Sequence, residues 1–171
     1  SKVETFTVTL DDDNGGTVDR TITVTIYGTN DVPVVATTDV TGEVTELVTA
    51  AGNLEDTGSI AFTDADVTDT HTVSVTATSA GALGTLTPSV DAVNGEIDWS
   101  YSVAASAVEY LADGESKVET FTVTLDDDNG GTVDRTITVT IYGTNDVPVV
   151  ATTDVTGEVT ELVTAAGNLE D

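Results

Sequence analysis

The chain contains no cysteine and very few basic residues. Without thiols, neither a disulfide framework nor a thiolate metal site can form, so other interactions must stabilise the fold. Lys and Arg number 4 against 31 Asp and Glu, which gives a formal net charge of −27. Such charge repels nucleic acid and anionic membrane surfaces, and no apolar run approaches the roughly 18 residues of a membrane span. The sequence therefore predicts neither nucleic acid binding nor membrane insertion.

The surplus of carboxylates points to bound cations. The acids lie at the ends of apolar runs and not in the long like-charge blocks typical of disordered tails, so a folded chain is expected. Crowded carboxylates destabilise a compact state by self-repulsion unless cations neutralise them. In a chain without thiolates the expected ion is Ca²⁺, which takes about six to eight oxygen ligands from carboxylates, amides and backbone carbonyls.

A long internal repeat organises the chain. Residues 1–56 recur letter for letter as residues 116–171, so the chain covers about one and a half units of a tandem array with a period of 115 residues. A domain-sized repeat suits a protein whose task is length or valency. The expected parts are 1–37, the C-terminal half of one unit; 38–152, a complete unit; and 153–171, the N-terminal stub of the next. Pro33 and Pro148 mark very short linkers between them.

Apolar residues alternate with Thr, Ser and Asp through most of the unit, which predicts half-buried strands in antiparallel sheets. Strands are expected over residues 41–48, 59–63, 71–78, 84–90, 96–103, 117–125 and 132–142. Seven strands in about 110 residues predict an all-β fold, an Ig-like antiparallel Greek-key sandwich.

Individual residues fit this fold. Asn129, Gly130 and Gly131 tolerate the positive φ of a tight hairpin between the last two strands. Trp99 has the parity of a core residue, and Tyr110 is expected to be a corner tyrosine whose hydroxyl binds nearby backbone. His71, the single histidine, is expected to be structural or solvated, since a transition-metal site would need partners of its own kind.

The unit also resembles a known family. It contains the segments TGEVTE, GSIAFTDADVTDTHTVSV, GEIDWSYSV and VEYLADGESKVETFTVTLDDDNGGTVDRTITVTIYGTNDVP. These resemble, over a whole repeat, the VCBS-type repeats of giant bacterial surface adhesins of the RTX type, which are similar to cadherin-like sandwiches. The resemblance implies a secreted, extracellular rod of Ca²⁺-braced extender domains on the bacterial cell surface. Such a rod holds an adhesive tip away from the cell in adhesion and biofilm formation.

The expected metal ligands come from this resemblance and from strand parity. The resemblance implies one end of the unit with Glu46, Asp113, Glu115 and the linker residues Asn145 and Asp146, and a site on the next unit with Asp64 and Asp66. Parity places the linker with Asn30 and Asp31 beside the 64–69 loop and the 126–129 hairpin, as an acidic cup. The full set of expected Ca²⁺ ligands is Asn30, Asp31, Glu46, Asp64, Asp66, Asp69, Asp113, Glu115, Asp126, Asp127, Asp128, Asn145 and Asp146. Gly143 and Val147 stand where the cadherin linker has further ligands, so one or two ions per junction are expected.

Three classes of function remain open at this stage. The first is a structural extender whose partners are the neighbouring identical repeats, and the second is a Ca²⁺-dependent module that binds carbohydrate or protein. Thr-rich strand faces without aromatic platforms disfavour sugar binding. The third, an enzyme, is not expected, because a chain with one His and no Cys offers no nucleophile and base that the topology would bring together. For any single carboxylate, a simply solvated acidic loop remains the alternative.

Identical neighbours also compete. Residues 1–37 and 116–152 suit the same two strand positions, and the second copy is expected to win because it follows the fifth strand through a short crossover. The half unit would then keep apolar strand faces and open edges, which favour strand-swapped self-association.

Overall fold

The structure is a computed structural model that describes residues 1–150 and 156–160. Its strands are β1 (Lys2–Asp11), β2 (Thr17–Ile26), β3 (Val34–Val35), β4 (Thr41–Thr45), β5 (Asn53–Thr63), β6 (Thr72–Ala77), β7 (Thr85–Asp91), β8 (Glu96–Ala104), β9 (Ser116–Asp126) and β10 (Thr132–Tyr142), with one 3₁₀ turn, η1 (Ala105–Ala107). Within the described ranges, no helix is long and apolar enough to cross a membrane. The expected stub at 153–171 lies outside the described residues except for 156–160.

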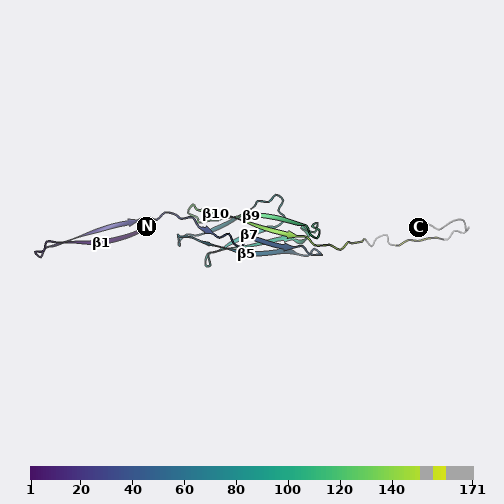
Figure 1. Cartoon of the computed structure of the whole chain (residues 1–171), viewed down its shortest axis with the longest axis horizontal. Helices are drawn as coiled ribbons and strands as arrows, with labels where there is room; N and C mark the ends of the chain where they lie inside the picture. Colours follow the sequence, from purple (N-terminus) through teal and green to yellow (C-terminus); the bar gives the residue numbers. More distant parts are fainter. Residues whose placement is uncertain (151–155, 161–171) are drawn as a thin grey trace.

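Eight strands form a two-layer sandwich, and the predicted all-β, Ig-like fold class is confirmed. One sheet has the order β4-β10-β9-β6 and the other β3-β5-β8-β7; β9 and β10 lie in one layer and β5 and β7 in the other (Figure 1). All pairings are antiparallel except that of β10 with β4, which is parallel. The parallel pair arises because the chain changes sheets between β3 and β4, a step that the alternation of residues did not reveal.

Two strand boundaries differ from the sequence-based expectation. β3 precedes residue 38, the expected start of the unit, yet Val35 is buried against the core; a two-residue strand is too short to show alternation. β5 begins at Asn53 and not at 59. Its inward positions include Gly58, where a Cβ would lie 2.4 Å from Trp99 Cζ2. The indole of Trp99 fills the space that an apolar side chain at position 58 would otherwise occupy. The inward position therefore carries a glycine, and the first half of β5 shows no clear alternation of apolar and polar residues.

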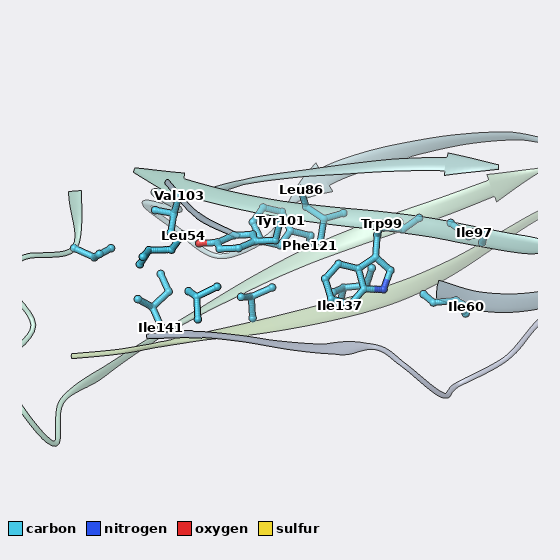
Figure 2. Packing of buried hydrophobic residues seen from close by; sticks show 14 of the residues in the cluster. Leu54, Ile60, Leu86, Ile97, Trp99, Tyr101, Val103, Phe121, Ile137 and Ile141 are labelled. Carbon is cyan, nitrogen blue, oxygen red and sulfur yellow. The ribbon is translucent and has the colours of Figure 1, made fainter. Parts of the chain in front are cut away.

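The core lies between the two sheets (Figure 2). Trp99 is 2% exposed, which confirms its predicted core position, and its Nε1 donates to Asp39 O at 3.1 Å. Tyr101 packs edge-on against Phe121 with 5.9 Å between ring centroids. Burial of these rings, together with Ile137 from the opposite sheet, stabilises the contact between the layers.

A buried carboxylate pins the crossover between β6 and β7. Glu119 is fully buried and accepts hydrogen bonds from the Tyr101 hydroxyl at 2.9 Å and from the backbone N–H of Leu83 and Gly84 at 2.6 and 3.0 Å. Burial, and then the Glu119 carboxylate, raise the pKa of Tyr101 above its ordinary value, so the hydroxyl stays a donor. The prediction for Tyr110 is wrong, because that ring is 63% exposed and its hydroxyl makes no hydrogen bond within the described part of the chain.

The turn between β9 and β10 depends on two glycines for different reasons. Positive φ falls on Asp128 at 58° and Gly130 at 107°, whereas the expectation placed it at Asn129, Gly130 and Gly131. Gly131 is needed for space, because a Cβ there would lie 2.2 Å from Asp127 Oδ2. The turn therefore closes tightly around the Asp127 carboxylate.

The sandwich takes its last two strands from the second copy of the repeated segment. β9 and β10 pair from Asp126 with Thr132 to Ser116 with Tyr142. The first copy, β1 and β2, forms the same hairpin in the same relative register but pairs only with itself. In Figure 1 this hairpin lies beyond the end of the sandwich. Its strand residues are exposed apart from the partly buried Glu4.

The two copies provide a matched test of the core. Ile137 is fully buried and its sequence equivalent Ile22 is 50% exposed. Ile137→Ala leaves a cavity and is expected to lower the free energy of unfolding by about 2–5 kcal/mol, measured by urea denaturation. Ile22→Ala is expected to change it by less than about 0.5 kcal/mol. Equal losses in the two variants would mean that the first hairpin also belongs to a packed core.

Candidate metal centres

Three carboxylates converge where the linker enters the sandwich. One oxygen from each of Asp64, Asp69 and Asp127 lies within 4.8 Å of the others; these residues are called the proximal cluster. Asp64 follows β5, Asp69 precedes β6, and Asp127 begins the β9–β10 turn. Strand parity predicted this convergence of the 64–69 loop and the hairpin turn.

Asp127 is held by the turn that it begins. Its Oδ1 accepts the backbone N–H of Asn129 and Gly131, both at 2.8 Å, and its Oδ2 accepts Asn30 Nδ2 at 2.9 Å. The Asn30 amide, followed by the backbone N–H groups of the turn, lowers the pKa of Asp127 although burial opposes the shift. Asp127 therefore remains a carboxylate at neutral pH, in spite of being fully buried.

The 64–69 loop is fixed by its own carboxylates. Asp64 accepts the Asp66 N–H at 2.9 Å through Oδ1 and His71 Nε2 at 2.9 Å through Oδ2. His71 also packs on Phe62, with 4.9 Å between ring centroids, so the histidine orients a carboxylate. Asp69 Oδ2 is buried and has no hydrogen-bond partner among the described residues, which leaves an oxygen lone pair available to an ion.

Two contacts hold the linker at this end of the sandwich, one to Asp127 of the cluster and one to Asp66, which belongs to the 64–69 loop but lies outside the cluster. Asn30 bonds Asp127, and the backbone N–H of Asp31 donates to Asp66 Oδ2 at 2.7 Å. Two other predicted ligands lie outside the cluster. Asp126 caps the Asp128 N–H at 2.9 Å, and Asp128 accepts the hydroxyls of Thr70 and Thr72 at 3.1 and 3.2 Å. These two carboxylates stabilise the turn.

A second set of carboxylates lies at the other end of the sandwich. One oxygen from each of Glu46, Glu109 and Asp146 lies within 4.8 Å of the others; these residues are called the distal cluster. Glu46 directly follows β4, and its N–H donates to Tyr142 O at the end of β10. Its side chain accepts Thr144 N–H at 3.0 Å through Oε2, while Oε1 is buried and has no partner within residues 1–150 and 156–160.

Glu109 is the residue that sequence reasoning missed. It follows η1 between the buried residues Val108 and Leu111, and in the part of the chain that the structure describes its buried Oε1 also has no partner. The crossover has no strand alternation, so no periodic signal marks this side chain as inward. The spacing of the two apolar anchors around it is the signal that could have found it.

The remaining predicted residues at this end play other parts in the structure. Asp113 is exposed and lines the same hollow as Glu109, Asn145 and Asp146. Glu115 caps its own loop, accepting the Ala112 N–H at 3.1 Å. Asn145 donates through Nδ2 to Asp146 O at 3.3 Å. Asp113 and Asn145 therefore lie beside the distal cluster, whereas Glu115 stabilises the 112–115 loop.

The clusters share a shortage of positive charge. All four Lys and Arg residues lie in the described part of the chain, and their ion pairs are Lys2 with Glu4 and Lys117 with Glu119. Burial, and then the charges of Asp146 and Glu46, raise the pKa of Glu109. Oxygens separated by up to 4.8 Å fit around one Ca²⁺, whose ligands lie about 2.3–2.6 Å from the ion. Each cluster can therefore hold a hard divalent cation, with further oxygens from backbone or water.

Comparisons with known proteins give limited information. No protein-family profile matches the chain, and no curated protein matches it. Among solved structures, AggA, the major subunit of aggregative adherence fimbriae type I from Escherichia coli, aligns with a TM-score of 0.44 and 15% identity over 69% of this chain and 99% of that one. The sialic acid binding region of a Streptococcus sanguinis SK1 adhesin aligns at 0.41 and 17% over 81% of this chain and 37% of that one.

A third structure, a nucleoside hydrolase-related hypothetical protein from Saccharophagus degradans, aligns at 0.37 and 15% over 67% of this chain and 26% of that one. At these scores the similarities support no inference about function. The function must therefore be inferred from the residues of the chain itself.

The raised pKa of Glu109 predicts that Glu109→Gln has opposite effects on thermal stability in chelator and in calcium. Below its ordinary pKa of about 4.3, Glu109 is protonated in the folded and unfolded chain alike, and its contribution to stability is intact. That contribution is lost as the pH rises through the raised folded-state pKa, because the unfolded chain releases the proton more readily. In chelator at pH 7, Glu109→Gln is expected to raise the melting temperature, and the gain should vanish below about pH 4.

In excess Ca²⁺ the same substitution should have the opposite effect and reduce the rise in melting temperature that calcium causes, because a ligand is lost. Calorimetry in chelator and in calcium checks both signs. A Glu109→Gln variant with an unchanged calcium response would remove Glu109 from the metal site.

Proposed function

We propose that the chain is part of a tandem structural extender in a bacterial surface adhesin, braced by Ca²⁺ at the junctions between units. The observation that carries this proposal is the position of the two clusters at opposite ends of one sandwich. Asp127 begins the turn that precedes β10, and the backbone N–H of Glu46 donates to the carbonyl of Tyr142 at the end of β10. A unit with an oxygen-rich site at each end is suited to linear assembly.

The linker connects the two kinds of site. Asn145 and Asp146 are the sequence copies of Asn30 and Asp31. Asp146 contributes an oxygen to the distal cluster, whereas Asn30 and Asp31 contact the proximal loops. In an array, each GTNDVP linker thus supplies groups to the unit before it and to the unit after it. Ions bound on both sides of so short a linker would stiffen the joint.

The charge balance supports the same proposal. A net charge of −27 with acids concentrated at the junctions makes neighbouring ends repel each other when no cation is bound. Calcium converts this repulsion into attraction. Extracellular modules bind the ion with dissociation constants of about 10⁻⁴–10⁻³ M, so the array would be flexible where calcium is scarce and rigid in a calcium-rich medium. The family resemblance supports the extracellular, cell-surface location.

One observation favours the alternative, a carbohydrate- or protein-binding module. A shallow hollow of about 520 Å³ on the β5–β8–β7 sheet is lined by hydroxyls and by the carboxylates of Asp39 and Asp98. Its single aromatic residue, Trp99, is 2% exposed, so it offers no ring on which a sugar could stack. A glycan array in calcium separates the two functions, because specific millimolar or tighter binding would favour the module.

The repeated sequence allows the calcium site to be tested against an internal control. Asp127→Asn and Asp12→Asn change the same residue in the same local sequence, but only Asp127 belongs to a cluster. At 10 mM Ca²⁺ one site of this affinity should add about 1.4–2.7 kcal/mol of stability, a rise of roughly 5–10 °C over chelator. Asp127→Asn should abolish most of the proximal site's part of the rise and leave the distal site's part, whereas Asp12→Asn should leave the whole rise unchanged.

Because each variant is compared with itself in chelator, loss of the Asp127 turn contacts cancels from the result. Equal calcium responses in the two variants would show that the stabilising ion binds elsewhere. Isothermal titration calorimetry of the same variants gives the number of sites.

The extender function predicts a change of shape. In a chain of two complete units, EGTA should shorten the maximum dimension measured by small-angle X-ray scattering and lower the melting temperature. Asp64→Ala with Asp66→Ala should do the same in the presence of calcium. Asp134→Ala, which removes an exposed charge from a sheet face, serves as the control. Identical scattering with and without calcium would argue against a braced rod.

A further inference from the structure

The segment from β3 to β4, residues 34–45, holds the entry side of the unit to both sheets. The chain enters the sandwich at the end of the proximal cluster and leaves it at the end of the distal cluster (Figure 1). β3 pairs with β5 in one sheet, and β4 pairs with β10 in the other. A force that pulls the two linkers apart therefore acts on this segment at one side and on β10 at the other.

β4 and β10 are arranged so that such a force makes them slide along each other. They run parallel, and Thr41 to Thr45 pair with Thr138 to Tyr142. The entry linker lies before β4 and the exit linker follows β10, so tension draws the two strands in opposite directions along their common axis. In this shear geometry the evenly spaced hydrogen bonds of the parallel ladder share the force. Strands that are pulled apart from one end lose their bonds one at a time.

Arg135 reinforces the contact between this segment and β10. It lies two residues before the buried Ile137, at the parity of the core-facing residues, and is partly buried. Its Nε donates to Ala36 O at 2.9 Å and its Nη2 donates to Val35 O, so the guanidinium reaches from one sheet to the edge of the other. Hydrogen bonds from a charged donor are roughly twice as strong as neutral ones. Since Val35 and Ala36 precede β4, tension from the entry linker reaches these two bonds before it reaches the ladder.

Carboxylates tie the same segment to β5. Asp39 Oδ2 accepts the backbone N–H of Ser59 at 2.6 Å, and Asp56 Oδ2 accepts that of Glu43 at 2.7 Å. Trp99 Nε1 also donates to Asp39 O. Residues 35–43 are therefore bonded to both sheets by side chains as well as by the ladders, and these contacts must also break when the segment slides.

We propose that residues 34–45 and β10 form a mechanical clamp, reinforced by Arg135, that resists tension along the chain. The proposal rests on the proposed function, because an extender that holds an adhesive end away from the cell transmits tension from unit to unit. The clamp itself lies within one sandwich and needs no bound ion. Forced unfolding is governed by the rate of unfolding, so the clamp should appear as a long lifetime under force along this axis.

Force spectroscopy of the full-length chain in chelator tests the clamp, with handles attached to peptide tags at the two termini. Arg135→Met retains an apolar stem but has no donor. It should shorten the lifetime of the sandwich at constant force about tenfold or more, because at least one charge-assisted hydrogen bond is lost. Arg20→Met, the same change in the β2 copy, should leave the lifetime unchanged, since Arg20 donates to Asp19 O in its own strand. A chain whose shape and melting temperature ignore calcium would contradict the bracing at the junctions and not the clamp.

The direction of the force provides a second control. A handle on Val93→Cys, in the exposed turn between β7 and β8, paired with the C-terminal tag, applies tension that bypasses residues 34–45. The chain has no cysteine of its own to interfere. In this geometry Arg135→Met should change the lifetime much less than with terminal handles. Equal shortening in both geometries would show that Arg135 stabilises the fold without resisting the force, and would overturn the proposal.

A reversible cross-link tests the ladder without removing Arg135. Glu43 pairs with Thr140 between β4 and β10, a separation that suits a disulfide, so Glu43→Cys with Thr140→Cys joins the strands on oxidation. With terminal handles, oxidation should lengthen the lifetime at constant force, and reductant should reverse the change. An unchanged lifetime after oxidation would mean that β4 and β10 do not separate when the unit yields. That result would overturn the proposal even where Arg135→Met fails to fold, which circular dichroism detects.

Discussion

Burial of one hairpin face underlies the arrangement of the whole unit. The apolar side chains of β9 and β10 attach this ribbon to the opposite sheet, and both acidic clusters depend on its ends. Asp127 stands at the turn, and Asp146 follows the last strand. Hydrophobic packing is non-directional and tolerates many sequences, but here it fixes the separation between two groups of carboxylates. The core thus sets the spacing of the charges.

The pKa values of carboxylates in the two clusters are shifted in opposite directions. Asp127 receives three hydrogen bonds that favour its ionised form and lower its pKa, whereas burial and neighbouring charges raise the pKa of Glu109. The proximal cluster is therefore organised as a set of carboxylates before any ion arrives. A cation bound at the distal cluster would favour the ionised form of Glu109 and oppose the rise in its pKa, so cation binding there would be coupled to pH.

Three features could be predicted from the sequence: the all-β sandwich, the core position of Trp99, and the convergence of the linker, the 64–69 loop and the hairpin turn. They could be predicted because period-two alternation and loop parity depend only on the local order of residues. The sequence did not reveal β3 or the role of Glu109. It also did not show that Tyr101, and not Tyr110, is the tyrosine whose hydroxyl forms a buried hydrogen bond. A two-residue strand has no period, and a 3₁₀ crossover does not alternate. The partner of Tyr101 is 18 residues away, at a separation that no local pattern encodes.

The short linker affects both the repulsion between neighbouring units and the exchange of strands between them. In the proposed array, a short linker would bring the carboxylate ends of successive units close together, and bound cations would relieve their repulsion. For the same reason, a hairpin from the preceding unit cannot fold back onto the sandwich that follows it. Val32 lies beside Gly131, about 36 Å from Tyr142 along the strand, whereas the chain from Tyr27 to Val32 reaches at most about 18 Å. A longer, more flexible linker would relax the repulsion but would also allow this misfolding. Linker length therefore couples the need for metal at the junction to the fidelity of folding along an array of identical units.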